Sequence, residues 1–229
     1  MKICLSVVLA SALVILTGCG TAPQLPLPVA SHAFAAPSNS YGVAMTALPT
    51  VDTTFPGAAC LLCLAAASIA NSGLTTYTKT LPSDDLAALK IQVADALRKK
   101  GARVTMIDKL DINALPDSAK AAPNFARKDF TSLKSKYNVD KLLVIDISMA
   151  GIERNYASYI PAGDPKAKVA GSSYIVNLND NAFEWYLPLN VMKASDGKWD
   201  EAPKYPGLTN AYYQVVELTK DQLLAPLSQ

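Results

Sequence analysis

The sequence has very little histidine: a single residue, His32, in 229. Histidine is the most frequent general base and one of the commonest metal ligands near neutral pH. Because no histidine follows residue 32, the rest of the chain can build neither a Ser-His-Asp or Cys-His nucleophile pair nor a histidine-based metal site. We therefore expect a protein that is not an enzyme and that holds no metal and no cofactor.

An excess of charge of one sign is also lacking. The 21 Lys and Arg residues are balanced by 19 Asp and Glu residues, which gives a net charge of +2. A domain that binds nucleic acid would carry a clear basic excess on one face or along one helix. This balance excludes nucleic acid from the expected partners.

The apolar run at the N-terminus, Ile3 to Leu16, is too short to cross a membrane as a helix, because a spanning helix needs about 20 residues. Lys2 precedes this run and Thr17 and Gly18 follow it. One cation, an apolar segment and then small residues form the three-part layout of a secretory signal peptide. We therefore expect residues 1–18 to be a signal peptide.

Leu16-Thr17-Gly18-Cys19 resembles the lipobox of bacterial lipoproteins at all four positions. The resemblance implies cleavage before Cys19 and lipidation of that residue, with palmitate among the acyl chains. Two or more chains hold a protein stably in a membrane. Gly20 stands where enterobacterial sorting rules would place Asp in inner-membrane lipoproteins, which favours the periplasmic face of the outer membrane. The alternative is an ordinary signal or a short N-terminal anchor.

Two cysteines remain after this assignment, Cys60 and Cys63, in a C-x-x-C pattern. Their Ala and Leu neighbours favour two small packed side chains. A local disulfide is the next interpretation, since an exported chain meets an oxidising compartment. A redox pair usually has an electropositive neighbourhood, and a metal site would need two further ligands. All four interpretations stay open.

The chain divides into the signal peptide (1–18), a lipid-anchored flexible tether rich in Pro, Ala and Ser (19–40), and a single domain (41–229). Within the domain, apolar periodicity and turn residues predict alternating strands and helices. The expected fold class is α/β (α+β), a β-α-β-α-β-β-β-α mixed sheet with helices packed on it. The strands are expected over 41–48, 103–108, 142–147, 169–178 and 182–193, with helices over 84–100, 125–137 and 208–227.

Two passages resemble the TolB amino-terminal-domain superfamily, which includes the curli secretion lipoprotein. Residues 86–104 are similar to that family's L-x-x-A-L-x-x-x-G-x-x-V helix and strand. Residues 136–147 (Lys-Tyr-Asn-Val-Asp-Lys-Leu-Leu-Val-Ile-Asp-Ile) are similar to its K-Y-G-V-D-Y-L-L-V-x-x-I step, with Asn138 in place of Gly. The resemblance covers about residues 41–50 and 82–227, and it implies a TolB-like fold with an envelope role and no catalytic residues.

Residues 51–81 depart from that pattern. Ala58 to Ala70 is almost entirely Ala, Leu and Cys, which predicts an extra apolar helix after the first strand. The favoured interpretation is a helix buried under the sheet, with contact to a neighbouring subunit or a lipid surface as the alternative. Residues 74–81 are β-prone and predict a short strand or an extended loop.

Trp199 is the one large apolar residue in the charged turn Asp196–Glu201. Loops carry function disproportionately, so Trp199 is a candidate partner contact, with a cap on the edge of the core as the alternative.

These features together predict an outer-membrane lipoprotein that serves as a non-enzymatic binding or scaffold module of a periplasmic envelope assembly. Its expected partners are the membrane, through the acyl chains on Cys19, and envelope proteins whose identity the sequence does not give. One alternative is a homo-oligomeric secretion or pore component resembling the curli secretion lipoprotein. The other is a thiol-disulfide protein that uses Cys60 and Cys63.

Overall fold

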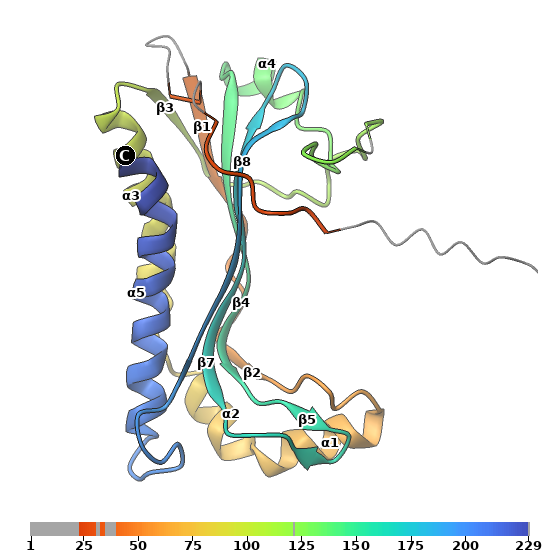
Figure 1. Ribbon diagram of the computed structural model, residues 1–229, viewed down its shortest axis with the longest axis vertical. Coiled ribbons are helices and arrows are strands. Elements are labelled where there is room, and N and C mark those ends of the chain that lie inside the picture. Colours follow the sequence, from red (N-terminus) through yellow and green to blue (C-terminus); the bar gives the residue numbers. More distant parts are fainter. Residues whose placement is uncertain (1–22, 31–32, 35–39, 121, 229) are drawn as a thin grey trace, which may run out of the picture.

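The computed structural model describes residues 23–30, 33–34, 40–120 and 122–228. A mixed sheet with the order β3-β1-β4-β7-β8 forms its centre, and two long helices, α3 and α5, lie side by side along one face (Figure 1). The predicted α/β fold class, a mixed sheet with helices packed on it, is confirmed. The strands are β1 (Ser40–Met45), β2 (Asp52–Thr54), β3 (Arg103–Ile107), β4 (Lys141–Glu153), β5 (Tyr156–Ala157), β6 (Ile160–Pro161), β7 (Lys166–Asn177) and β8 (Phe183–Ala194). The helices are α1 (Leu61–Ala70), α2 (Ser72–Thr78), α3 (Asp84–Lys99), α4 (Leu133–Tyr137) and α5 (Pro206–Ser228).

The strand β4 has two successive partners along one of its edges. β1 pairs in parallel with its first residues, 141–145, and β2 pairs in parallel with its last, 151–153. Gly151 sits at this second junction with a φ of +140°, and a Cβ there would lie 2.0 Å from the backbone oxygen of Asp52. Only glycine permits this approach, because any side chain would collide with β2.

The helical stripe predicted for α3 is confirmed. Leu86, Leu89, Val93 and Leu97 are all buried against the sheet and α5. Gly101 ends the helix with a φ of +81°, as expected of a helix stop. Ser83 occupies the N-cap position, and its side chain makes no capping hydrogen bond. The first turn is still acidic, which suits the helix dipole.

The helix predicted over residues 125–137 is wrong for its first half, since α4 covers only Leu133–Tyr137. Phe125 pairs instead with Ala182, and the backbone N–H of Phe130 donates to Oδ1 of buried Asn181 at 3.0 Å. These long-range hydrogen bonds replace the helical ones over residues 125–132, which periodicity alone did not reveal. Asn138 adopts the left-handed conformation expected of a helix stop, with a φ of +53°.

Part of the predicted tether is structured. Leu27 exchanges two backbone hydrogen bonds with Tyr186 of β8, at 2.9 and 3.0 Å, and the N–H of Ala30 donates to the oxygen of Glu184 at 2.8 Å. Residues 23–30 therefore run along the sheet as an added edge rather than as a free linker. The proposed signal peptide and Cys19 lie outside the described residues.

A projection extends sideways from the end of the sheet where β4 ends and β7 begins, and we call it the arm and define it as residues 55–78 and 154–163. It contains α1, α2, β5 and β6 and gives the molecule the outline of a bracket (Figure 1). We call the rest of the described chain the body. The prediction of a strand or extended loop at 74–81 is wrong, because residues 72–78 form α2. The hydroxyl of Thr78 donates to the Leu74 oxygen at 2.9 Å, so a β-prone side chain is accommodated within the helix.

Candidate functional site: an exposed apolar arm

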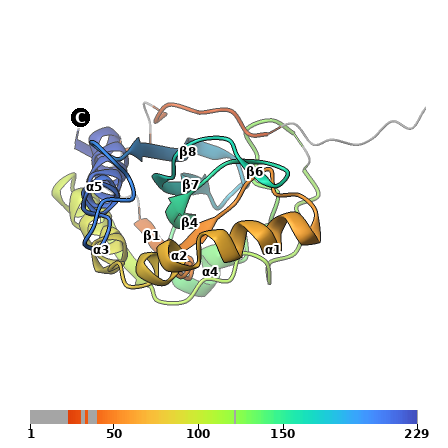
Figure 2. The ribbon, with the colours of Figure 1, turned by 90° about the horizontal axis from the view of Figure 1, so that it is seen from below.

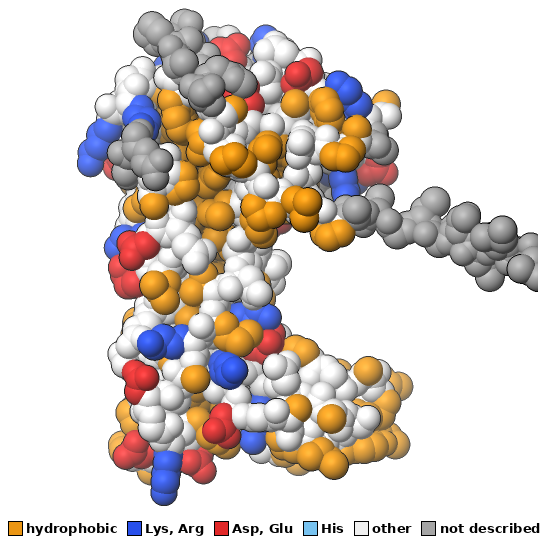
Figure 3. Space-filling view, in the orientation of Figure 1, with side chains coloured by type: hydrophobic (Ala, Val, Ile, Leu, Met, Phe, Trp, Pro, Cys, Tyr) orange, Lys and Arg blue, Asp and Glu red, His pale blue; other side chains and the backbone are white. Residues whose placement is uncertain are grey.

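The apolar helix α1 is present but is not buried under the sheet, so that prediction is wrong. Only Cys63 and Ala67 of its residues are buried. The exposed fractions are 89% for Leu61, 72% for Leu62 and 76% for Ile69. Figure 3 shows the arm as a protruding mass of hydrophobic side chains, separated from the body by an indentation. A helix of this composition was expected to lie in the interior, and its exposure gives the arm a contiguous apolar surface of the kind that typically meets another surface.

A second segment extends the same surface. The β5–β6 hairpin adds Tyr159 and Ile160, which are 56% and 70% exposed. The hydroxyl of Tyr159 lies 3.7 Å from the sulfur of Cys60, directly before α1. Two segments far apart in sequence thus combine into one apolar patch.

A very small core holds the arm together. Ala58, Cys63, Ala67 and Tyr156 are buried against one another, with Phe55 packed beside them. The rings of Phe55 and Tyr156 meet edge to face with centroids 5.8 Å apart. This cluster is far too small to stabilise a separate domain, so the arm depends on its attachment to the sheet.

A buried polar cluster joins the two chain segments of the arm to each other. Asn71, only 3% exposed, lies between α1 and α2. Its Nδ2 donates to the oxygen of Ala67 at 2.7 Å and to the Tyr156 hydroxyl at 2.6 Å. Its Oδ1 accepts from Nη1 of Arg154 at 2.8 Å. One amide side chain therefore joins the C-terminal end of α1 to the segment that directly follows β4.

Trp199 lies at the base of the arm. Its ring stacks on that of Tyr205 with centroids 6.2 Å apart and planes 1° from parallel. The guanidinium of Arg154 lies 4.8 Å from the Trp199 ring centroid, within the range of a cation–π contact. The structure thus gives Trp199 intramolecular contacts that connect arm and body, and its contact with a partner stays a prediction.

Cys60 and Cys63 are joined by a disulfide at the start of α1. Cys60 is the N-cap residue and is exposed, whereas Cys63 is buried in the small core of the arm. The Cys60 sulfur also accepts the N–H of Cys63 at 2.9 Å. The bridge thus fixes the first turn of the exposed helix.

A second buried polar cluster holds the N-terminal segment to the body. Lys141 and Glu184 form an ion pair of 2.8 Å with side chains 7% and 5% exposed. Lys141 Nζ also donates to the oxygen of Ala33 at 3.0 Å, and the Tyr41 hydroxyl donates to that same oxygen. Burial, reinforced by the Glu184 carboxylate, raises the pKa of Tyr41 far above its ordinary value, so this hydroxyl stays a donor.

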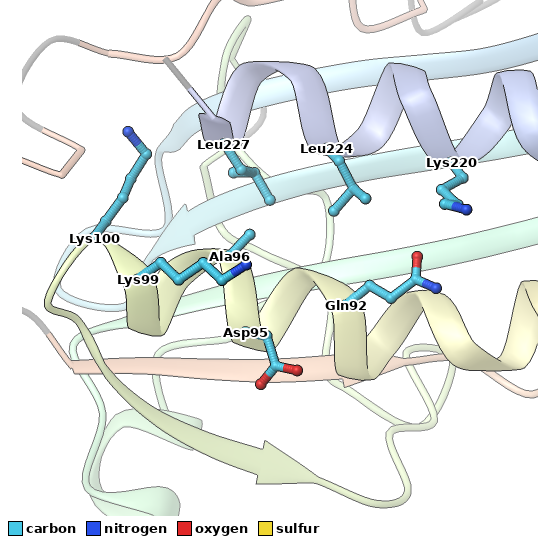
Figure 4. Close-up of a pocket in the computed structure, with 8 residues that line it drawn as sticks. All are labelled: Gln92, Asp95, Ala96, Lys99, Lys100, Lys220, Leu224 and Leu227. Carbon is cyan, nitrogen blue, oxygen red and sulfur yellow. The ribbon is translucent and has the colours of Figure 1, made fainter.

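The described residues contain no group of three or more His, Cys, Asp and Glu that could hold a metal ion. Among the helices in the described part of the chain, none has the length and apolar character needed to cross a membrane. A shallow groove of about 560 Å³ lies between the C-terminal halves of α3 and α5 (Figure 4). Its lining combines apolar residues with Gln92, Asp95, Lys99, Lys100 and Lys220.

Of the residues singled out in the sequence, three meet in or beside the arm: Cys60, Cys63 and Trp199. Sequence reasoning missed Asn71, Arg154 and the exposed hairpin residues. A signal was present, because no charged residue lies between Asp52 and Lys79 or between Arg154 and Asp164. Only the fold shows that these two uncharged stretches lie together.

No family model and no curated protein matches this sequence. Three solved structures align with it at low similarity. A PelC dodecamer from Paraburkholderia phytofirmans is 13% identical, with 84% of this chain and 89% of that chain covered and a TM-score of 0.35. The lipoprotein GNA1162 from Neisseria meningitidis is 12% identical, with 81% and 99% covered and a TM-score of 0.34. A neuraminyllactose-binding hemagglutinin homolog from Helicobacter pylori is 12% identical, with 84% and 83% covered and a TM-score of 0.37. No conclusion about this chain rests on these likenesses, and the resemblance to the TolB superfamily stays a prediction.

Proposed function

We propose that this chain is a non-enzymatic lipoprotein of the bacterial envelope, anchored in the outer membrane through Cys19, and that it serves as a binding or scaffold module of a periplasmic assembly. The arm carries the surface through which the chain makes its functional contact. The observation that carries the proposal is the arm's exposed, uncharged helix α1, which the protein holds rigidly away from its own core.

Exposure of this kind needs a reason. Large apolar side chains usually gather in the interior, and a contiguous exposed patch marks a contact with another surface. The body already has a complete core between the sheet and the helices α3 and α5, so α1 is not needed to fill it. The buried Asn71 cluster holds the two segments of the arm together, so that α1 keeps its shape without a large core of its own.

The anchor and the arm are tested separately in cells. Labelled palmitate should enter the wild-type chain and not Cys19→Ala, since that variant lacks the acylated residue. Native electrophoresis of solubilised envelopes should show the wild type in a larger complex. Leu62→Ser should weaken this complex at least tenfold, whereas Ile91→Ser, at an apolar residue on α3 that is 58% exposed, should leave it intact. Equal loss in both variants would contradict the role of the arm.

The homo-oligomeric alternative makes a different prediction about size. A ring-forming secretion or pore component keeps a defined multiple of its chain mass in detergent. A monomer by light scattering, with the detergent mass subtracted, would rule out this alternative.

The thiol-disulfide alternative is favoured by one specific observation. Cys60 is exposed at the N-terminus of a helix, where thiolates are stabilised, and Cys63 is buried behind it. If this pair is redox-active, the purified reduced chain should reduce a protein disulfide such as that of insulin. The double variant Cys60→Ala, Cys63→Ala should then lose this activity, and full retention of function by that variant would exclude the alternative.

A further inference from the structure

We propose that the arm lies in the surface of the same membrane that holds the Cys19 anchor, with α1 among the lipids at the boundary between headgroups and acyl chains. This inference rests on the proposed function and specifies what the arm contacts. It commits the arm to a lipid surface rather than to a second copy or another protein, and Leu62→Ser then weakens the envelope complex because it loosens the arm from the membrane on which the complex assembles.

The first argument is the distribution of exposed residues around α1. The exposed positions include Leu61, Leu62, Leu64 and Ile69 together with three alanines and Ser68. At about 100° per residue they cover roughly 240° of the helix circumference. A protein surface covers one side of a helix, whereas lipid surrounds whatever is immersed in it. This wide apolar exposure therefore fits a lipid environment better than a protein groove.

The second argument is the absence of charge. No Asp, Glu, Lys or Arg occurs in residues 53–78 or in residues 155–163, which together make almost all of the arm. Immersing a charged side chain in a bilayer is costly, and protein interfaces normally carry a polar rim. The lack of charge also implies that anionic lipids are not required, so association should depend on apolar area alone.

The third argument is the length of α1 and the aromatic residue beside it. The 10 residues of α1 correspond to about 15 Å, half of the roughly 30 Å thickness of a hydrocarbon core. The helix can therefore lie in one leaflet but not cross the bilayer. Tyr159 is exposed next to Cys60, and tyrosine is enriched at the interface between headgroups and acyl chains.

The fourth argument is the position of the anchor. Residues 23–30 are fixed to β8, and their N-terminal end and the tip of the arm project to the same side of the molecule in both views (Figures 1 and 2). The stretch of chain from Cys19 to Gln24 can span at most about 18 Å. The anchor is thus confined near the side from which the arm extends, and both can reach one membrane plane.

The experiment uses the lipidated full chain with the photoreactive residue p-benzoylphenylalanine at one position. Leu62 is the test position, and Ile91 on α3 is the matched control, because both are apolar, helical and exposed. The protein is reconstituted into phosphatidylcholine vesicles at low and at high salt, and it is also irradiated in living cells. Mass spectrometry identifies each adduct and verifies the acyl chains on Cys19 in the same sample.

We expect phospholipid adducts at position 62 with at least ten times the yield at position 91, and a yield that changes less than twofold with salt. Three results would overturn the inference while Cys19 is acylated: equal lipid yields at both positions, a dimer crosslinked through position 62, or an adduct with another protein in place of lipid. If the chain instead carries no acyl groups on Cys19, this result contradicts the proposed function. The two failures are therefore distinct.

Discussion

The body and the arm of this protein use apolar residues in opposite ways. In the body, the stripes of α3 and α5 are buried against the sheet, and most charged side chains lie at the surface, with the paired Lys141 and Glu184 as buried exceptions. In the arm, the most hydrophobic helix of the described chain presents most of its side chains to the surroundings. The same chemistry thus stabilises the fold in one region and remains available for contact in the other.

The two regions also differ in what holds them in place. The body is stabilised mainly by apolar burial, which is roughly proportional to the area removed from water. The cluster inside the arm has only four buried residues and is supplemented by directed contacts, namely the Asn71 hydrogen bonds and the disulfide, while Leu74 of α2 packs into the core of the body. Directed contacts preserve an exposed shape that the hydrophobic effect alone would tend to collapse.

The largest effect is expected from breaking the buried ion pair of the body with Lys141→Met. This change leaves the Glu184 carboxylate buried without its cation, and the loss of one partner of such a pair costs about 3–5 kcal/mol. Chemical denaturation should show global destabilisation of body and arm together, because Lys141 begins β4 and the arm follows directly on that strand. Lys99→Met, at an exposed position, serves as the control and should change stability by less than about 0.5 kcal/mol.

An intermediate effect, confined to the arm, is expected from Asn71→Ala. The change removes the partner of the Tyr156 hydroxyl and of the Arg154 guanidinium, at a cost of roughly 1–3 kcal/mol. Hydrogen exchange should rise in residues 61–78 and stay unchanged in α3 and α5. Asn190→Ala, on an exposed position of β8, is the control. Faster exchange throughout the molecule would show that arm and body are not separable in this way.

The smallest effect is expected from the titration of Asp140, at the end of the body remote from the arm. The Ser40 hydroxyl donates to its Oδ2 at 2.8 Å and is the main cause that holds the pKa of Asp140 below its ordinary value of 3.8. Because the folded-state pKa is depressed, this carboxylate stabilises the body above pH 3.8, and the contribution is lost as the pH falls through the lowered pKa.

Ser40→Ala should therefore raise the pKa of Asp140 toward 3.8, as followed by NMR of the carboxyl carbon. The resonances of the arm should not respond over the same pH range, since no part of the arm contacts this carboxylate. If the pKa of Asp140 does not change in the variant, the positive charges of Lys134 and Arg103 are the main cause of its lowered value instead.

Much of the body could be predicted from the sequence, because its apolar residues recur with the period of the helix or strand face that is buried. The bounds of α3 were predicted nearly to the residue. The prediction rested on the helix stop at Gly101 and on the apolar stripe of Leu86, Leu89, Val93 and Leu97. The apolar run at Leu142–Ile147 marked the central strand, although β4 extends farther at both ends. A local pattern is enough to predict a helix or strand when its buried residues recur with the period of that element.

The arm could not be predicted in this way. Composition gave the helix α1 correctly but placed it inside, because apolar helices usually occupy a core. Its exposure depends on where β4 and β7 carry it, which is a property of the whole sheet. The role of Asn71 depends likewise on Arg154 and Tyr156, more than eighty residues away in sequence. No local pattern contains such a contact.

The continuity of β4 from the body into the arm has a mechanical consequence. This strand has 13 residues, which corresponds to about 40 Å of extended chain, and it reaches the arm without an intervening linker. A hydrogen-bonded ribbon of this kind holds the arm in a fixed position and orientation relative to the body. If the tip of the arm rests on a surface, the helices α3 and α5 stand at a set height above it, with a set orientation. Any partner that binds the far end of the body would therefore be held at a defined distance from that surface.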